Sequence, residues 1–65
     1  MENLFRRFKG ELVDVKTVSG GIYSGRITEI TNDYICLIET SGAPGQQVFL
    51  AFTAIESMAA TVTNS

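Results

Sequence analysis

Residues 12–38 read LVDVKTVSGGIYSGRITEITNDYICLI, and this stretch determines the fold. It holds three apolar runs rich in β-branched residues, which are typical of strands. Two short turn signals separate the runs, Ser19-Gly20-Gly21 and Asn32-Asp33. Glycine adopts positive φ without steric cost, and Asn and Asp favour turns through local hydrogen bonds. The stretch therefore predicts three antiparallel strands joined by tight turns.

The middle run, residues 22–31, carries two signals of curvature. Gly25 would weaken a regular strand, so it indicates a bend or a close approach of two backbones. Ile27 and Ile30 are three positions apart, which breaks strict alternation and predicts a bulge or twist between them. A long strand bent at glycine allows a small sheet to curl into a barrel.

Two further strands are expected after the loop at residues 40–47, which contains Gly42, Pro44 and Gly45. Residues 48–52 are apolar on both faces, as the third strand at 34–39 is. In a small barrel this indicates that one face or the open edge packs against a neighbouring subunit. A weaker fifth strand is predicted at 55–62. The predicted oligomer interface consists of Val48, Phe49, Leu50, Phe52, Ile55 and Met58.

Residues 2–9, ENLFRRFK, predict a short amphipathic helix before the first strand. Leu4, Phe5 and Phe8 fall on one face, and Gly10 is a suitable C-terminal stop. Two helical turns are not stable alone in water, so this face is expected to dock on the rest of the domain. A candidate basic surface consists of Arg6, Arg7 and Lys9.

The composition limits the class of protein to one small domain, residues 1–65. A single core below about 70–80 residues rarely supplies more than about 3–5 kcal/mol. Cys36 is the one cysteine and there is no histidine, which excludes an internal disulfide and argues against a structural zinc site. Oligomerisation is therefore the expected source of extra stability. Cys36 itself, flanked by apolar residues, is expected to be buried.

Neither catalysis nor membrane insertion is predicted. The chain offers no histidine base, no Ser/Lys pair and no paired-carboxylate motif, so we expect no enzyme, no metal and no cofactor. Residues 1–9 are too polar for a signal peptide, and no apolar run approaches the roughly 18 residues of a membrane span. A cytoplasmic protein is expected. The net charge of −2 and the pI of about 4.8 argue against strong non-specific binding of nucleic acid.

Four segments share a spacing that is similar to the two motifs of a known family. They are Val13-x-Val15-x-Thr17-x-Ser19-Gly20, Gly25-Arg-Ile27-Thr-Glu-Ile30, Tyr34-Ile-Cys-Leu37 and Phe49-Leu50-x-x-x-x-Ile55. With the short helix in front, the chain resembles the Sm and Sm-like (LSm, Hfq-related) proteins. The resemblance implies a five-stranded, strongly bent antiparallel barrel with a short N-terminal helix. It also implies a homo-oligomeric ring, usually of about five to seven subunits, in which the fourth strand of one subunit pairs with the fifth of the next.

The resemblance also implies a site for single-stranded RNA in the loop after the second strand. In the family, an acidic residue, an aromatic and an asparagine contact one base there. Asn32, Asp33 and Tyr34 lie in this loop with a displaced register, and Ile35 or Cys36 occupies the asparagine position. For Tyr34, packing over the turn is favoured over base stacking. The Arg-Gly pair of the family's second motif is replaced by Ala51-Phe52, and the histidine of the Hfq-type motif is absent.

Two functions stay open from the sequence. The first is a non-catalytic, RNA-binding Sm-like ring protein. Its candidate contacts are Asn32, Asp33, Tyr34, Arg6, Arg7 and Lys9. In a ring, the basic residues would repeat about one face and attract phosphates despite the acidic net charge, although solvated helix charges are the usual explanation. The second function is an Sm-fold structural or protein-interaction oligomer that has lost the RNA pocket.

Overall fold

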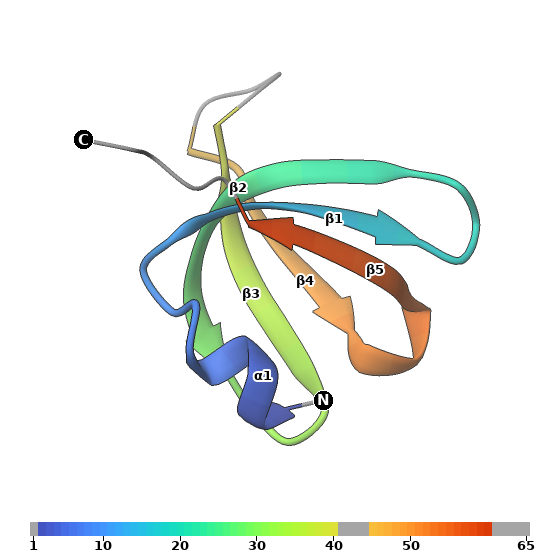
Figure 1. Cartoon of the computed structure of the whole chain (residues 1–65). Coiled ribbons are helices and arrows are strands. Elements are labelled where there is room, and N and C mark those ends of the chain that lie inside the picture. Colours follow the sequence, from blue (N-terminus) through green and yellow to red (C-terminus); the bar gives the residue numbers. More distant parts are fainter. Residues whose placement is uncertain (1, 41–44, 61–65) are drawn as a thin grey trace.

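One short helix and five antiparallel strands make up the part of the chain that the computed structural model describes, residues 2–40 and 45–60 (Figure 1). The elements are α1 (Glu2–Arg6), β1 (Leu12–Thr17), β2 (Ile22–Ile30), β3 (Tyr34–Glu39), β4 (Gln47–Ala51), the 3-10 helix η1 (Phe52–Ala54) and β5 (Ile55–Ala60). The strands form one open sheet in the order β4-β3-β2-β1-β5. The prediction of a mainly β fold with a short N-terminal helix is therefore confirmed.

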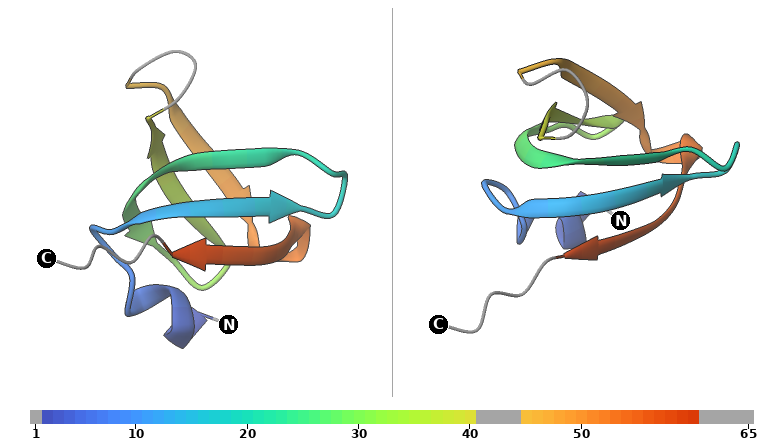
Figure 2. Two further views of the ribbon diagram at one scale, coloured as in Figure 1. Left: turned by 45° about the horizontal axis from the view of Figure 1, so that its top comes forward. Right: turned by 90° about the horizontal axis from the view of Figure 1, so that it is seen from above.

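The bend of the sheet lies in β2. Figure 2 shows β3 and β4 running across the direction of β1 and β5. Gly25 pairs with Glu39, and a Cβ at Gly25 would overlap the carbonyl oxygen of Ile38. The register between β2 and β3 shifts between Ile27 and Glu29. The close backbone approach at Gly25 and the bulge before Ile30 are both confirmed.

The core lies on the inner face of this bent sheet. In β1, Val13, Val15 and Thr17 are buried while the residues between them are exposed, so the expected alternation is present. From the other strands, side chains that are at most 8% exposed complete the core: Ile27, Ile30, Ile35, Leu37, Leu50 and Ile55. Phe5 of α1 is 2% exposed and covers this cluster. Phe8, just beyond α1, is partly buried and packs against the same cluster, so the N-terminal segment docks through two aromatic side chains.

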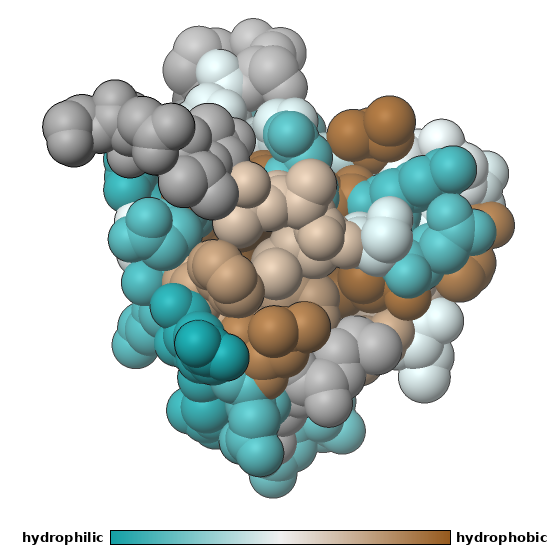
Figure 3. Space-filling model, viewed as in Figure 1, coloured by the Kyte–Doolittle hydropathy of each residue, from teal (hydrophilic) through white to brown (hydrophobic). Residues whose placement is uncertain are grey.

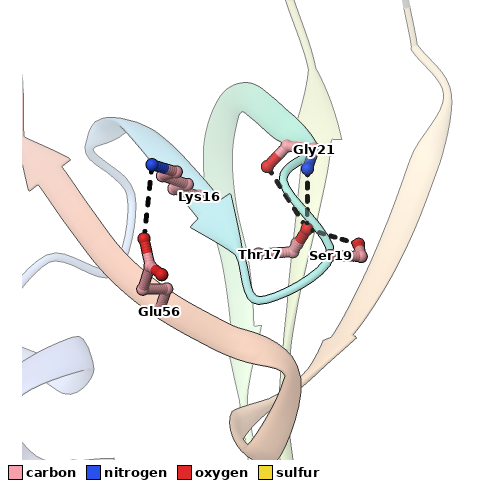
Figure 4. A network of polar contacts seen from close by, with 5 residues as sticks. All are labelled: Lys16, Thr17, Ser19, Gly21 and Glu56. Carbon is pink, nitrogen blue, oxygen red and sulfur yellow. Dashed lines mark hydrogen bonds and ion pairs between the residues drawn. The ribbon is translucent and has the colours of Figure 1, made fainter.

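Thr17 fixes the turn between β1 and β2 (Figure 4). Its Oγ1 accepts a hydrogen bond from the Gly21 N–H at 3.0 Å and lies 2.9 Å from Ser19 Oγ. The Thr17 N–H donates to the Gly21 carbonyl at 2.8 Å. Gly20 has φ +97°, which only glycine adopts without strain. The predicted glycine turn is confirmed, and its stability comes from the threonine before it.

The helix is shorter than the expected span of 2–9, since α1 ends at Arg6. Beyond it the N–H groups of Arg7, Phe8 and Lys9 donate to carbonyls three residues earlier, which tightens the last turn. Gly10 has φ +86° and donates its N–H to the Ile27 carbonyl at 2.8 Å. This bond joins the turns that follow α1 to β2, whereas the helix itself has already ended at Arg6, before the stop that was expected at Gly10.

The last two strands also differ in their bounds. The fourth strand was expected at 48–52, but β4 begins at Gln47, and Phe52 begins η1 instead. The Phe52 N–H donates to the Asp33 carbonyl at 2.9 Å, which continues the register of β3 and β4 by one position before the chain turns into η1. The fifth strand was expected to reach Val62. β5 is described to Ala60, and Val62 lies outside the described residues, as do residues 41–44 of the predicted loop.

Candidate functional site

The turn between β2 and β3 presents two of the predicted RNA-binding residues to solvent. Asn32 and Asp33 are both exposed. Thr31 organises the turn, because its Oγ1 accepts the N–H of Asp33 at 3.1 Å and that of Tyr34 at 3.0 Å. Thr31 was not among the predicted site residues. The signal was available, since Ser and Thr hydroxyls bond the backbone two or three residues ahead in such turns.

Tyr34 leaves this turn and packs on the outer face of the sheet. Its ring lies edge-on to the ring of Phe49, with centroids 5.7 Å apart and an interplanar angle of 74°. Such aromatic pairs are worth about 0.5–1.5 kcal/mol beyond the burial of their area. Tyr34 is half-buried, whereas Phe49 is 59% exposed. The structure therefore joins a predicted RNA contact and a predicted interface residue into one aromatic pair.

The basic segment lies at the same end of the sheet as this turn (Figure 1). The ring of Phe5 in α1 packs at 5.4 Å on the ring of Phe52. Phe52 in turn donates its N–H to Asp33 in the turn. Phe52 thus links α1 to the 31–33 turn. The exposed side chains of this end include Arg6, Arg7 and Lys9.

The two outer strands of the sheet each have a ladder on one side only. β4 pairs with β3, and β5 pairs with β1; between the described residues of β4 and β5 there is no pairing. An edge strand exposes unpaired N–H and C=O groups and can accept another strand, so natural proteins usually protect it with charge, proline or a bulge. β4 reads QVFLA and has no charge and no proline. Within the described residues, β4 therefore carries neither of these two protections on its open edge.

The edge of β5 carries one charge, and that charge has a partner within the chain. Lys16 Nζ lies 3.4 Å from Glu56 Oε1, and both side chains are about half exposed (Figure 4). The remaining residues of β5 are small or apolar, IESMAA in full. Both open edges thus present mostly uncharged strands.

The six predicted interface residues fall into two groups. Leu50 and Ile55 are 7% and 8% exposed and belong to the core of the chain itself. The side chains with accessible surface left are Val48, Phe49, Phe52 and Met58. The structure therefore narrows the predicted interface to residues on the two edge strands and on the 3-10 turn between them.

Cys36 lies beneath the outer face, where it is 1% exposed and its Sγ accepts a hydrogen bond from Gln47 Nε2 at 3.1 Å. The expectation of a buried cysteine is confirmed. Among the described residues, no group of three or more His, Cys, Asp or Glu side chains could hold a metal ion. Within residues 2–40 and 45–60 no helix has the length and apolar character needed to cross a membrane.

Comparisons with protein-family models, with curated proteins and with solved structures find no match to this chain.

Proposed function

We propose that this chain is a non-catalytic, Sm-like barrel subunit that assembles with further copies of itself into a ring. β4 of one copy pairs with β5 of the next. The observation that supports this most directly is the pair of open, largely uncharged edges at the two ends of one sheet. The strands have similar lengths, five residues in β4 and six in β5, so one can pair with the other along its whole length.

The symmetry of such a contact is compatible with a closed assembly. It joins two different surfaces, β4 on one copy and β5 on the next, and is therefore heterologous. Heterologous contacts form a ring when the rotation between subunits closes. The small size of the chain points the same way, since a domain of 65 residues has a modest core and gains stability by burying its edges.

A lysine on either edge tests the proposal. Phe49→Lys places a charge on β4, and Ser57→Lys places one on β5; both residues are exposed, so the subunit should stay folded. We expect each variant to be monomeric by analytical ultracentrifugation where the unmodified chain is oligomeric. Ile22→Lys, at a site on β2 that is 67% exposed, is the matched control and should keep the mass of the unmodified oligomer.

Mixing the two variants makes the test specific for the β4–β5 pairing. Phe49→Lys keeps an intact β5 edge, and Ser57→Lys keeps an intact β4 edge. The mixture should form a heterodimer and nothing larger, since only one productive pairing remains. A monomeric unmodified chain at micromolar concentration contradicts the proposal, and so does a Phe49→Lys variant that keeps its full oligomeric mass.

A second candidate function is binding of single-stranded RNA at the α1 end of the ring. The observation in its favour is that exposed Arg7 and Lys9 lie at the same end as the exposed turn residues Asn32 and Asp33. Repeated around a ring, such cations sum to a field that attracts phosphates. The pairing of Tyr34 with Phe49 and the missing arginine at Ala51 weigh toward assembly as the main role.

Short U-rich and A-rich RNAs test this second function. Binding should weaken as salt rises, because phosphate contacts release counterions. The double variant Arg7→Gln/Lys9→Gln should weaken it further, whereas Lys16→Gln, on β1 and engaged with Glu56, should not. Absence of binding by the assembled protein at low salt would reject the RNA function and leave the assembly proposal intact.

A further inference from the structure

A groove runs between α1 and the open edge of β5. Its cavity has a volume of about 130 Å³. The residues that line it are Leu4, Phe5, Ile55, Glu56, Ser57 and Met58. Figure 3 shows apolar surface over β5 that reaches toward α1 on this face of the molecule. The groove therefore lies on the one side of β5 that has no neighbouring strand.

Leu4 is the unexplained residue of this groove. It is apolar, yet it is 50% exposed, whereas its neighbour Phe5 is 2% exposed in the core. The sequence placed Leu4 and Phe5 on one helix face that docks on the domain, but in the structure only Phe5 is buried. Leu4 thus forms an apolar wall of the groove beside Met58.

The core itself is incomplete at the two edges of the sheet. Val48 on β4 and Met58 and Ala60 on β5 pack against the core cluster but are only partly buried. These three residues lie on the two strands that lack an outer neighbour. A strand added at either edge would cover the surface of these side chains that is still accessible to solvent.

The alternation of side chains decides which residues would meet. In β4, Leu50 is buried and Val48 lies on the same inner face, two residues away, while Phe49 points to the outer face. In β5, Met58 is opposite the buried Val15 and so lies on the inner face. When a sheet continues from β5 into β4 of another copy, inner face meets inner face. Val48 then lies on the same face of the continued sheet as Met58.

We propose that the groove between α1 and β5 receives Val48 of a second copy of this chain, with Leu4 and Met58 as its apolar walls. The inference rests on the proposed pairing of β4 with β5 and assigns α1 a part in it. β4 brings no charge to the groove, and the one charge on β5, Glu56, is already paired with Lys16. On the outer face, Phe49 of the second copy lies over the small side chains of Ser57 and Ala59.

Leu4→Asp tests the role of the helix. Leu4 is half exposed and outside the core, so the charge should leave the subunit folded, which circular dichroism checks. Loss of a buried leucine contact should weaken self-association about tenfold or more in sedimentation equilibrium. The matched control is Leu12→Asp, at a leucine on β1 that is 39% exposed and distant from the groove; it should leave the association unchanged.

Crosslinking supplies a second test, in which the expected result is the formation of a product and not the loss of self-association. A Leu4→Cys chain mixed with a Val48→Cys chain should yield a mixed dimer with a short bis-maleimide. Cys36 is 1% exposed and should not react, so the unmodified chain gives the background. The control mixture, Leu4→Cys with Val18→Cys, should give no more than that background.

The outcomes separate this inference from the proposed function. An oligomer that dissociates with Phe49→Lys but is unaffected by Leu4→Asp, and shows no Leu4–Val48 crosslink, overturns the groove proposal and keeps the edge pairing. A Leu4–Val48 crosslink together with weaker association of Leu4→Asp supports both. An unmodified chain that is monomeric removes both.

Discussion

The central strands of the sheet differ from the two edge strands in how fully one chain pairs them and buries their inward side chains. β1, β2 and β3 are paired on both sides, and their inward side chains, such as Val15, Ile27 and Leu37, are fully buried. β4 and β5 are paired on one side, and Val48 and Met58 stay partly accessible. The comparison teaches that folding of the subunit and assembly of subunits depend on different residues.

The largest loss of stability should come from a substitution in the central strands. One cross-strand pair allows a central residue and an edge residue to be compared directly. Leu37 on β3 is opposite Val48 on β4. Leu37→Ala should lower the free energy of unfolding by about 2–5 kcal/mol, because it leaves a cavity in the core. Val48→Ala should cost about 1 kcal/mol or less, since that side chain is only partly buried. Urea titration in the monomeric Phe49→Lys background measures both; equal losses would contradict the distinction between centre and edge.

The next effect concerns the bend in β2. Gly25→Ala should cost about 1–3 kcal/mol, since the added Cβ meets the backbone of Ile38 and β3 must move. The φ of Gly25 is not positive, so lack of space and not backbone strain is the cause. Gly45→Ala is the contrasting control. An added Cβ at Gly45 meets no atom within 4 Å, but φ is +84°, so any cost there comes from backbone strain and not from lack of space. If Gly25→Ala unfolds at the same urea concentration as the unmodified chain, the close approach has no energetic role.

A smaller loss of stability is expected at the hairpin turn between β1 and β2. Thr17→Val keeps the shape of the side chain but removes the acceptor for the Gly21 N–H. The cost should be about 1–2 kcal/mol, the usual penalty for a buried group left without its hydrogen bond. Thr17→Ser keeps the hydroxyl and should retain most of the stability. Thermal unfolding of the two variants side by side checks this, and a Thr17→Val variant that unfolds at the same temperature as the unmodified chain would contradict a role for the hydroxyl.

The smallest effect should come from the ion pair at the β5 edge. Lys16→Gln and Glu56→Gln should each change stability by about 0.5 kcal/mol or less, because both side chains are about half exposed to solvent. A double-mutant cycle at low and at high salt measures the coupling, which salt should reduce further. A coupling of several kcal/mol would mean that this edge is less accessible than the isolated chain shows.

Much of the fold followed from local signals in the sequence. β3 occupies 34–39 as predicted, Gly10 and Gly20 have the positive φ expected of a helix stop and a turn, and the bulge lies between Ile27 and Ile30. These features depend on residues close together in the chain. Turn chemistry and side-chain alternation act over a few positions, so they can be read before any tertiary contact is known.

The candidate sites were less predictable because they depend on contacts between distant segments. Packing was favoured over base stacking for Tyr34, but its partner, Phe49 on the next strand, was not predicted. Leu4 was expected to dock with Phe5, but half of it stays exposed beside β5. Neither outcome can be read from periodicity, since both depend on which strands become neighbours in the folded sheet.

The sequence by itself determined the strands, the turns and the bend at Gly25, because each follows from the shape and hydrogen bonding of neighbouring residues. The tertiary structure alone decided how the segment after α1 is joined to the sheet and which strands are left at the edges. The Gly10 N–H donates to Ile27 on β2, and β5 pairs with β1 and not with β4. Both features depend on hydrogen bonds between segments that are distant in the sequence. The pairing of β5 with β1 leaves β4 and β5 as the two open edges, on which the proposed assembly rests.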